Sequence, residues 1–189
     1  MYFEGYLTVL YIETRKMKIP RGFSLIELLV VVAMLGVLLA VAAPSFSQLI
    51  NNNKIVSETN GLLADLALAR SEVLKRGVGA VTVCATLDGS SCSSATDWSN
   101  GRLVFVDGGT VGTVDGGDVI LRNSGSMSGI TINSSGFSTT GFIAYRPSGA
   151  TTSSSQGTLT VCKSGYVGRI VTVSQIGRSV LADTSGNCL

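Results

Sequence analysis

The sequence has no histidine, and only 14% of its 189 residues are charged. Histidine is the commonest general acid–base group of enzymes and a preferred zinc ligand, so its absence argues against both roles. The four cysteines form no C-x-x-C pair, which further disfavours a zinc site, and no phosphate-binding glycine loop occurs. We therefore expect a protein that is not an enzyme and that holds no metal and no cofactor.

Calcium is the one metal for which the sequence offers candidate ligands. The segment 107–118, DGGTVGTVDGGD, carries three aspartates. No glutamate closes it, as one does in known calcium-binding loops. Its Asp-Gly steps are typical of tight turns, so we interpret it as a long hairpin loop.

Charge is unevenly distributed along the chain. Residues 84–118 carry five acids against one arginine, a net charge of −4, whereas residues 119–189 carry five cations against one acid, a net charge of +4. Four more cations precede the longest apolar run: Arg15, Lys16, Lys18 and Arg21. This pattern predicts an acidic middle, a basic last third and a basic N-terminal flank.

The longest apolar run covers residues 23–43, and Glu27 is its only charged residue. As a helix it would be about 31 Å long, close to the thickness of the hydrocarbon core of a bilayer. The basic flank predicts that the residues before it stay in the cytoplasm and that the rest of the chain lies across the membrane.

Two ordinary interpretations of this run are a secretory signal peptide, cleaved near Ala40–Ala42, and a plain membrane anchor. The run is longer than the apolar part of a signal peptide, about 7–15 residues, and it contains an acid. A carboxylate within a membrane segment costs about 2–3 kcal/mol, so Glu27 points to a function.

The residues Gly22-Phe23-Ser24-Leu25-Ile26-Glu27, after a basic stretch, resemble the prepilin peptidase site of type IV pilins and type II secretion pseudopilins. The resemblance implies a leader peptide at 1–22, starting at Met1 or Met17, and cleavage between Gly22 and Phe23. It also implies N-methylation of Phe23 and an assembly role for Glu27, which would pair with the terminal amine of a neighbouring subunit.

Beyond the apolar run, residues 44–77 predict an amphipathic continuation of the helix. Its apolar residues Leu62, Leu66, Ala69 and Val73 recur at helical spacing. Four charged residues lie elsewhere on the wheel: Glu58, Asp65, Arg70 and Lys75. Residues 78–189 contain eight short runs rich in valine, isoleucine and threonine, separated by glycine turns. We predict an α+β protein in which a long N-terminal membrane-spanning helix packs on a C-terminal β domain, either a sandwich or twisted sheets.

The order of landmarks in the β domain is similar to that of GspH/FimT minor pilins. These landmarks are Ala-Arg-Ser-Glu at 69–72, Val-Thr-Val-Cys at 81–84, Trp98, Arg-Pro-Ser-Gly at 146–149 and Gly177-Arg178. The resemblance covers residues 23–189 and implies the type IV pilin fold with a GspH-like β domain.

All four cysteines follow the membrane segment, which fits an oxidising compartment. Three pairings are possible. We favour Cys84–Cys92, which closes a short loop, and Cys162–Cys188, which would fix the C-terminal tail to a core strand.

DNA binding is a more specific alternative to a purely structural role. Some FimT proteins take up DNA, and that family carries a Gly-Arg-x-Arg motif. Here Gly177-Arg178 supplies its first half, and Val180 stands in place of the second arginine. The other cations of the last third, Arg146, Lys163 and Arg169, would extend a patch for phosphates, and few aromatic residues accompany them.

From the sequence we therefore expect a structural minor pilin or pseudopilin of a type II secretion pseudopilus or a type IV pilus, which supports protein secretion or pilus biogenesis. Its partners would be other pilins, prepilin peptidase and the bacterial inner membrane, crossed once, with the C-terminal domain in the periplasm or in an extracellular filament. The alternatives are a DNA-binding minor pilin for DNA uptake and, as a distant third, a secreted hydrolase.

Overall fold

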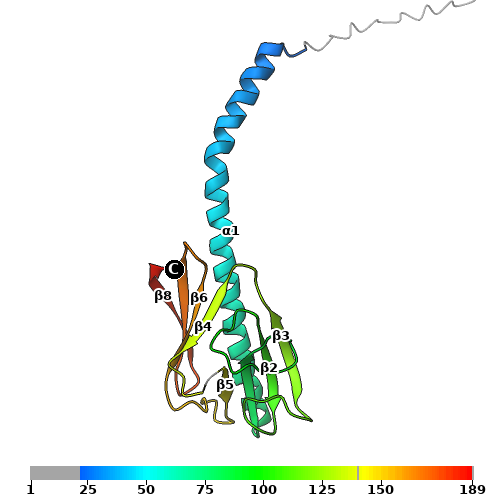
Figure 1. The fold of residues 1–189 in the computed structure, drawn as a ribbon, viewed down its shortest axis with the longest axis vertical. Helices are drawn as coiled ribbons and strands as arrows, with labels where there is room; N and C mark the ends of the chain where they lie inside the picture. The colour runs from blue at the N-terminus through cyan, green and yellow to red at the C-terminus, as the bar shows by residue number, and fades with distance from the viewer. Residues whose placement is uncertain (1–21, 140, 189) are drawn as a thin grey trace, which may run out of the picture. The chain divides into compact units, whose positions relative to one another are not determined.

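The computed structural model describes residues 22–139 and 141–188, except for the side chains of Val41, Ala43, Pro44 and residues 183–187. The predicted leader, apart from Gly22, lies outside the described residues. One helix and eight strands follow one another (Figure 1): α1 (Leu25–Arg76), β1 (Ala80–Ala85), β2 (Gly101–Asp107), β3 (Val119–Gly125), β4 (Thr131–Ser135), β5 (Phe142–Tyr145), β6 (Gly157–Cys162), β7 (Val167–Val173) and β8 (Ser179–Asn187). The chain forms two compact units, Met1–Ala43 and Pro44–Leu189.

The first unit contains the apolar part of α1. Its large side chains, from Phe23 to Leu39, are exposed. Within the described residues, α1 is the one helix that is long and apolar enough to cross a membrane, with a mean hydropathy of 2.9 in its apolar stretch. Exposure of so large an apolar surface to water is unfavourable, so lipid or other apolar helices must cover it.

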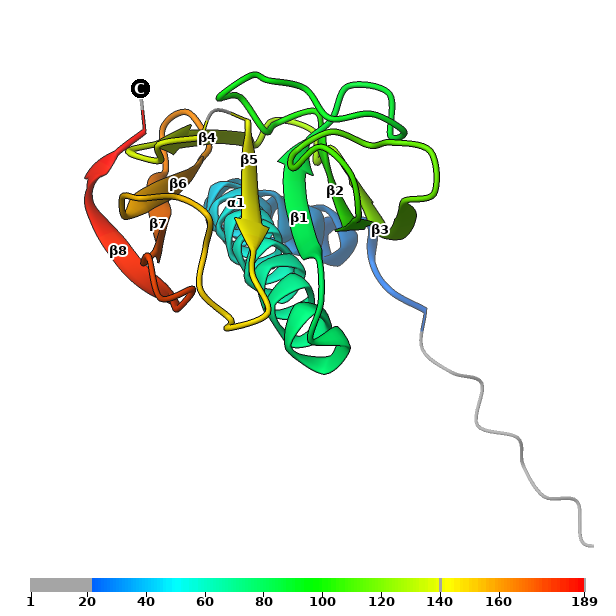
Figure 2. The same cartoon turned by 90° about the horizontal axis from the view of Figure 1, so that it is seen from below.

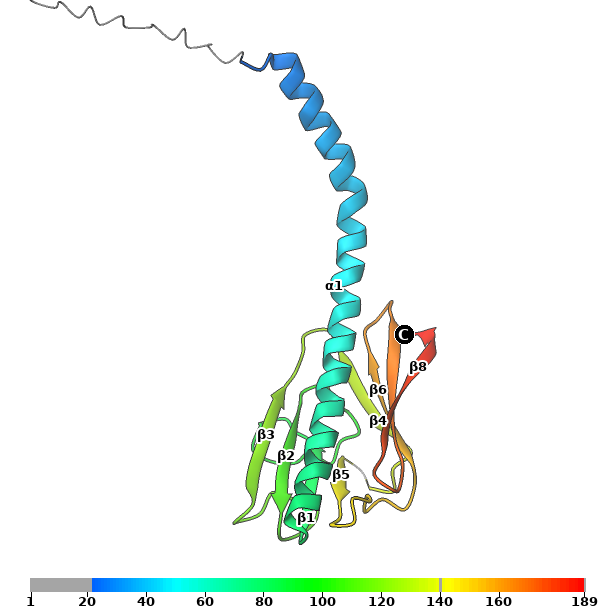
Figure 3. The ribbon, with the colours of Figure 1, turned by 180° about the vertical axis from the view of Figure 1, so that it is seen from behind.

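The second unit combines the rest of α1 with two antiparallel sheets of four strands each. One sheet has the order β3-β2-β1-β5, and the other has the order β4-β6-β7-β8. Figure 2, which looks along the helix, shows both sheets on one side of α1, with β5 and β4 at their adjoining edges. Figure 3 shows the same helix from behind, where no strand covers it.

The core of the second unit lies between α1 and the two sheets. The helix contributes the predicted stripe of Leu62, Leu66, Ala69 and Val73, all fully buried. These side chains belong to one cluster with residues of both sheets: Val81, Val83, Val104, Ile143, Leu159, Val161, Val171 and Val173. Because these residues alternate along their strands, each sheet presents one apolar face to the helix.

The other face of the first sheet is also covered. Cys84, Leu103 and Phe105 form a second buried cluster, against which Val114 and Phe142 pack. The cover comes from the two long loops that follow β1 and β2. This second layer explains why every residue of β1 is buried.

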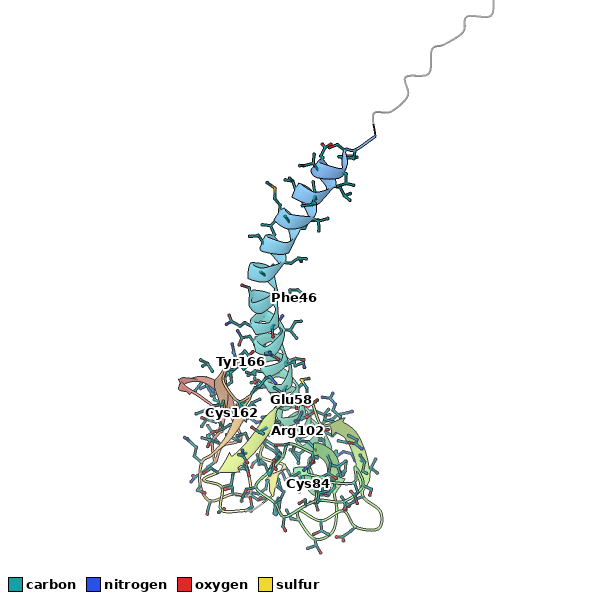
Figure 4. All side chains as sticks on the ribbon, turned by 45° about the horizontal axis from the view of Figure 1, so that its top comes forward. Phe46, Glu58, Cys84, Arg102, Cys162 and Tyr166 are labelled. Atoms are coloured by element: carbon teal, nitrogen blue, oxygen red, sulfur yellow. A yellow bond between two sulfur atoms is a disulfide. The ribbon has the colours of Figure 1, made fainter. Side chains whose placement is uncertain are left out.

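Two acids of α1 that the sequence placed outside the apolar stripe are buried beside it. Glu58 is 7% exposed and Asp65 is 1% exposed. Arg102 of β2, itself buried, donates one hydrogen bond to Glu58 and another to Asp65, the latter with an Nε–Oδ2 distance of 3.0 Å. Arg122 and Ser124 of β3 complete the surroundings of Asp65. Figure 4 shows Glu58 and Arg102 next to each other at the helix.

The predicted α+β fold is confirmed: a long N-terminal apolar helix precedes a unit rich in β structure. Three strands differ clearly in extent from the β-rich runs of the sequence, which cover 119–121, 129–132 and 179–181. The first of them, β3, continues to Gly125. β4 begins at Thr131 rather than at Gly129, because Gly129 lies in a turn with a φ of 76°. β8 extends to Asn187, because it pairs with β7 up to Asp183 and, after an irregularity in the register, again at Asn187.

Replacement of Arg102 by alanine should lower the free energy of unfolding by about 3–5 kcal/mol, because it leaves two buried carboxylates without their partner. Urea unfolding of the full chain in detergent measures this through Trp98, the single tryptophan, which is buried. Arg76→Ala is the matched control, since its ion pair with Glu72 is partly exposed and should contribute less than about 1 kcal/mol. If both variants lose the same free energy of unfolding, the buried cluster contributes no more to stability than an exposed ion pair.

Candidate processing and assembly site

The predicted cleavage point lies in the non-helical segment just before α1. Gly22, Phe23 and Ser24 have no regular secondary structure, and the side chain of Phe23 is exposed. A peptidase needs an accessible, extended peptide bond. The Gly22–Phe23 bond is exposed and lies outside the helix, whereas the bonds from Leu25 onward are held in it.

The same motif also starts the helix. Ser24 is the N-cap residue: its side-chain oxygen accepts a hydrogen bond from the backbone N–H of Glu27 (3.3 Å), and its carbonyl accepts one from Leu28 (3.1 Å). Ser-x-x-Glu is the sequence of a capping box. Glu27 also places a negative charge at the positive end of the helix dipole. The acid therefore has a local structural role besides the assembly role that the resemblance implies.

A disulfide joins Cys84 to Cys92, which is the pairing expected from the sequence. It closes the loop after β1 over the second buried cluster. Asp88 organises the loop, since its carboxylate accepts hydrogen bonds from the backbone N–H groups of Ser90 and Ser91. These two donors hold the pKa of Asp88 well below its usual range, so the carboxylate stays charged and bonded even in mild acid.

A second disulfide joins Cys162, at the end of β6, to Cys188 near the C-terminus. The backbone of Cys188 is also bonded to the β6–β7 turn, to the carbonyl of Tyr166 (2.9 Å) and to the N–H of Gly165 (3.2 Å). Gly168 lies against the sulfur atoms, where a Cβ would come within 2.6 Å of the Cys188 sulfur. This need for glycine at 168 was missed from the sequence, because it depends on the packing of two distant cysteines.

The five basic-patch candidates do not form one patch. Arg146 and Gly177-Arg178 lie together at one end of the second sheet. Gly177 has a φ of 76°, and a Cβ there would overlap the carbonyl oxygen of Gly149, to which the guanidinium of Arg70 also donates (3.1 Å). Lys163 and Arg169 lie at the opposite end of this sheet, on either side of the β6–β7 turn.

A third arginine, which the sequence did not single out as part of this patch, joins the first group. Arg70 of α1 and Arg178 line the same groove, with Leu63, Ala67 and Leu74 as its apolar residues. Tyr145 lies beneath the turn, and burial raises its pKa to about 12. We call Arg70, Arg146 and Arg178 the arginine tip.

The aspartates of the 107–118 segment are engaged with their own loop. Asp118 accepts a hydrogen bond from the backbone N–H of Gly108 (3.0 Å), Asp115 accepts one from Thr110 (2.7 Å), and Asp107 accepts one from Gly112 (2.8 Å). The carboxylates therefore stabilise the turns of the segment. In the described part of the chain, no three potential metal-ligating side chains come together.

A membrane-compatible helix with this start motif, joined to a β-rich unit, defines a protein of the type IV pilin class. The family described as "Type II transport protein GspH" matches residues 58–177, which is more than half of the chain. The chain therefore belongs to this family, and its predicted relation to GspH/FimT minor pilins is confirmed. The "Prokaryotic N-terminal methylation motif" matches residues 17–43.

Two solved structures of the type IV minor pilin FimU of Pseudomonas aeruginosa (strain PAO1) share the fold. The crystal form in space group P65 has a TM-score of 0.53 and covers 68% of this chain and 96% of that one. The form in P21 has a TM-score of 0.56 and covers 71% and 96%. Both are 22% identical to this chain, and no curated protein sequence matches it significantly. Family and fold are those of structural pilins rather than of enzymes.

Peptide mapping of the non-reduced protein should yield the pairs Cys84–Cys92 and Cys162–Cys188. In the chain-entropy description, loops of 8 and 26 residues contribute about 2.5 and about 3.5 kcal/mol to stability. The double variant Cys162→Ser/Cys188→Ser should therefore lose more stability than Cys84→Ser/Cys92→Ser, as measured by urea unfolding. A Cys92–Cys188 link, or free thiols in periplasmic material, would contradict the pairing.

Proposed function

We propose that the protein is a structural minor pilin or pseudopilin, made as a precursor that crosses the bacterial inner membrane once through residues 23–43. The unit from Pro44 onward lies in the periplasm and later in a filament. One observation carries the proposal: an accessible Gly22–Phe23 bond, a capped helix start and an acid at Glu27 coincide at the head of a 52-residue helix whose first part is apolar and exposed.

The proposed sequence of events follows from charge. Prepilin peptidase cuts after Gly22 and methylates Phe23, which leaves a positively charged amine four residues before Glu27. In lipid the carboxylate of Glu27 costs about 2–3 kcal/mol. A neighbouring subunit's terminal amine offsets that cost when the helices pack together, so insertion into the filament is favoured over return to the membrane.

Both kinds of filament use this design. The family description refers to type II transport, whereas the solved relatives are minor pilins of a type IV pilus. Residues 22–27 and α1 serve equally in a secretion pseudopilus and in a pilus. The proposed function is therefore that of a filament subunit that supports secretion or pilus biogenesis.

The variant Glu27→Ala should be processed normally but should fail to assemble. Mass spectrometry of membrane-extracted protein should show N-methylated Phe23 in both the wild type and the variant. The fraction recovered in sheared filaments should fall at least about tenfold, since 1.4 kcal/mol is enough for that change.

Glu72→Ala is the matched control, because Glu72 lies on the same helix and pairs with Arg76 of its own chain. It should leave assembly unchanged. A mature N-terminus at Ala43 or Pro44 would overturn the processing step, and normal incorporation of Glu27→Ala would remove the proposed role of the acid.

DNA binding is the second candidate function, and the arginine tip favours it. Arg178 is exposed there beside Arg70, and Gly177 allows a close approach of the two turns. Arg146 is exposed in the neighbouring turn, where its guanidinium donates to the carbonyl of Thr151. Three cations so arranged would contact phosphates without reading bases. The absent second arginine of the family motif, replaced by Val180, predicts weak binding.

We expect a dissociation constant of about 10⁻⁴–10⁻⁶ M for duplex DNA, increasing with salt, by fluorescence anisotropy on the full chain in detergent. Arg178→Ala should weaken binding and lower the salt slope by about one. Lys163→Ala, at the other end of the sheet, should change neither, and Val180→Arg should strengthen binding. An absence of binding at low salt would exclude this function.

A further inference from the structure

The end of the globular unit that joins the apolar helix carries a rim built from two segments. Asn51 of α1 donates a hydrogen bond to the hydroxyl of Tyr166 in the β6–β7 turn (2.7 Å). Gln48 and Asn52 line a recess together with Gly165, Tyr166 and Val167. In Figure 4, Tyr166 lies beside α1, between the levels of Phe46 and Glu58. We call residues 46–54 and 163–167 the rim.

The rim combines exposed apolar side chains with lysines. Phe46, Leu49 and Ile50 are exposed on the helix, and Val167, at the turn, is 53% exposed. Lys54 and Lys163 supply the positive charge, and neither rim segment contains an acid. Beyond the rim, Glu58 is bound to Arg102. Arg169 lies opposite Asp183 in the β7–β8 register, so it is not counted among the rim cations.

A lipid surface is the partner that fits this composition. Tyrosine, aliphatic side chains and lysine are the residues that proteins place at the boundary between hydrocarbon and headgroups. Lysines are attracted to anionic headgroups, and each contributes about fivefold in affinity near such a surface. A folded partner subunit would suit the apolar residues equally, but it would need acids to match Lys54 and Lys163.

Connectivity brings this end of the unit to the membrane. Pro44 follows directly on the apolar run, and Gln48 comes five residues after Ala43, about 8 Å along a helix. Because the unit is tethered there, its effective concentration at the surface is high and a weak contact is sufficient to hold it. The β7–β8 turn, with Ile176, lies at the opposite end of β7.

We propose that the rim rests on anionic phospholipid headgroups while the subunit is anchored in the membrane before assembly. The inference rests on the membrane anchoring in the proposed function. In this state Val167 and Tyr166 contact the headgroups. The contact is broken when the subunit enters the filament, so it belongs to the stored subunit rather than to the assembled one.

Photo-crosslinking tests the proposal with a matched pair of positions. p-Benzoylphenylalanine replaces Val167 in one variant and Ile176 in the other. The two residues are 53% and 67% exposed; Val167 is the first residue of β7, and Ile176 lies in the turn that follows the other end of that strand. The full chain is reconstituted in vesicles of phosphatidylethanolamine with 30% phosphatidylglycerol, about one anionic lipid in three, and irradiated. Mass spectrometry should find lipid adducts at position 167 and few at position 176.

A charge variant and its control separate headgroup contact from mere proximity. Lys163→Gln should lower the adduct yield at position 167 by about fivefold. Neutral phosphatidylcholine vesicles, which remove the attraction for both Lys54 and Lys163, should lower it at least as much. Lys75→Gln, an exposed lysine at the far end of α1, should leave it unchanged. Equal yields at 167 and 176, or adducts at 167 with protein only, would overturn the proposal.

Alkali extraction of the same vesicles distinguishes failure of the rim contact from failure of the membrane anchoring. Protein that resists extraction is membrane-inserted, so missing adducts at position 167 would then contradict the rim contact alone. Protein that is extracted would contradict the membrane anchoring and, with it, the rim contact.

Discussion

Both sheets of the globular unit depend on one apolar stripe of α1. Leu62, Leu66, Ala69 and Val73 are fully buried, and they lie in a single cluster with the inner faces of both sheets. Among the described residues, no strand of one sheet pairs with a strand of the other. The loop after β1 joins β4 through an isolated bridge between Asp97 and Asn133 and through backbone hydrogen bonds on either side of it. Each sheet is too small to bury its own apolar face, and both sheets therefore pack on the same helix.

An apolar stripe by itself sets which face of the helix is buried but not its position along the sheets, because apolar burial is non-directional. The buried charges supply that direction. Arg102 binds acids two turns apart on α1, Glu58 and Asp65, and the geometry of a guanidinium allows both contacts at one position of β2 along the helix. We infer that this cluster fixes the register between helix and sheet. The cluster stabilises the fold because each of its charged groups has a partner. Loss of one group would leave a buried charge unpaired and would destabilise the fold.

Local patterns were enough to predict the helical run, its apolar stripe and the eight strands, because periodicity acts over a few residues. The burial of Glu58 and Asp65 could not be predicted, since it depends on Arg102, which is distant in sequence and lies on β2, paired with β1. Strand order also separated the basic residues. Arg169 and Arg178 are nine positions apart, but β7 runs between them and carries them to opposite ends of its sheet.

The apolar part of α1 is exposed, whereas the rest of the helix packs on the sheets. Within the apolar part, Glu27 is the residue whose free energy depends most on what surrounds the helix. Lipid tails and aliphatic side chains are similar in polarity, so moving the exposed residues of the apolar run from lipid into a bundle of like helices changes little by the hydrophobic effect. Under the proposed function, the exposed valines and leucines therefore make the subunit compatible with both states without favouring either. The carboxylate of Glu27 is unfavourable in lipid and gains a cation in the filament, so one side chain gives the exchange its direction.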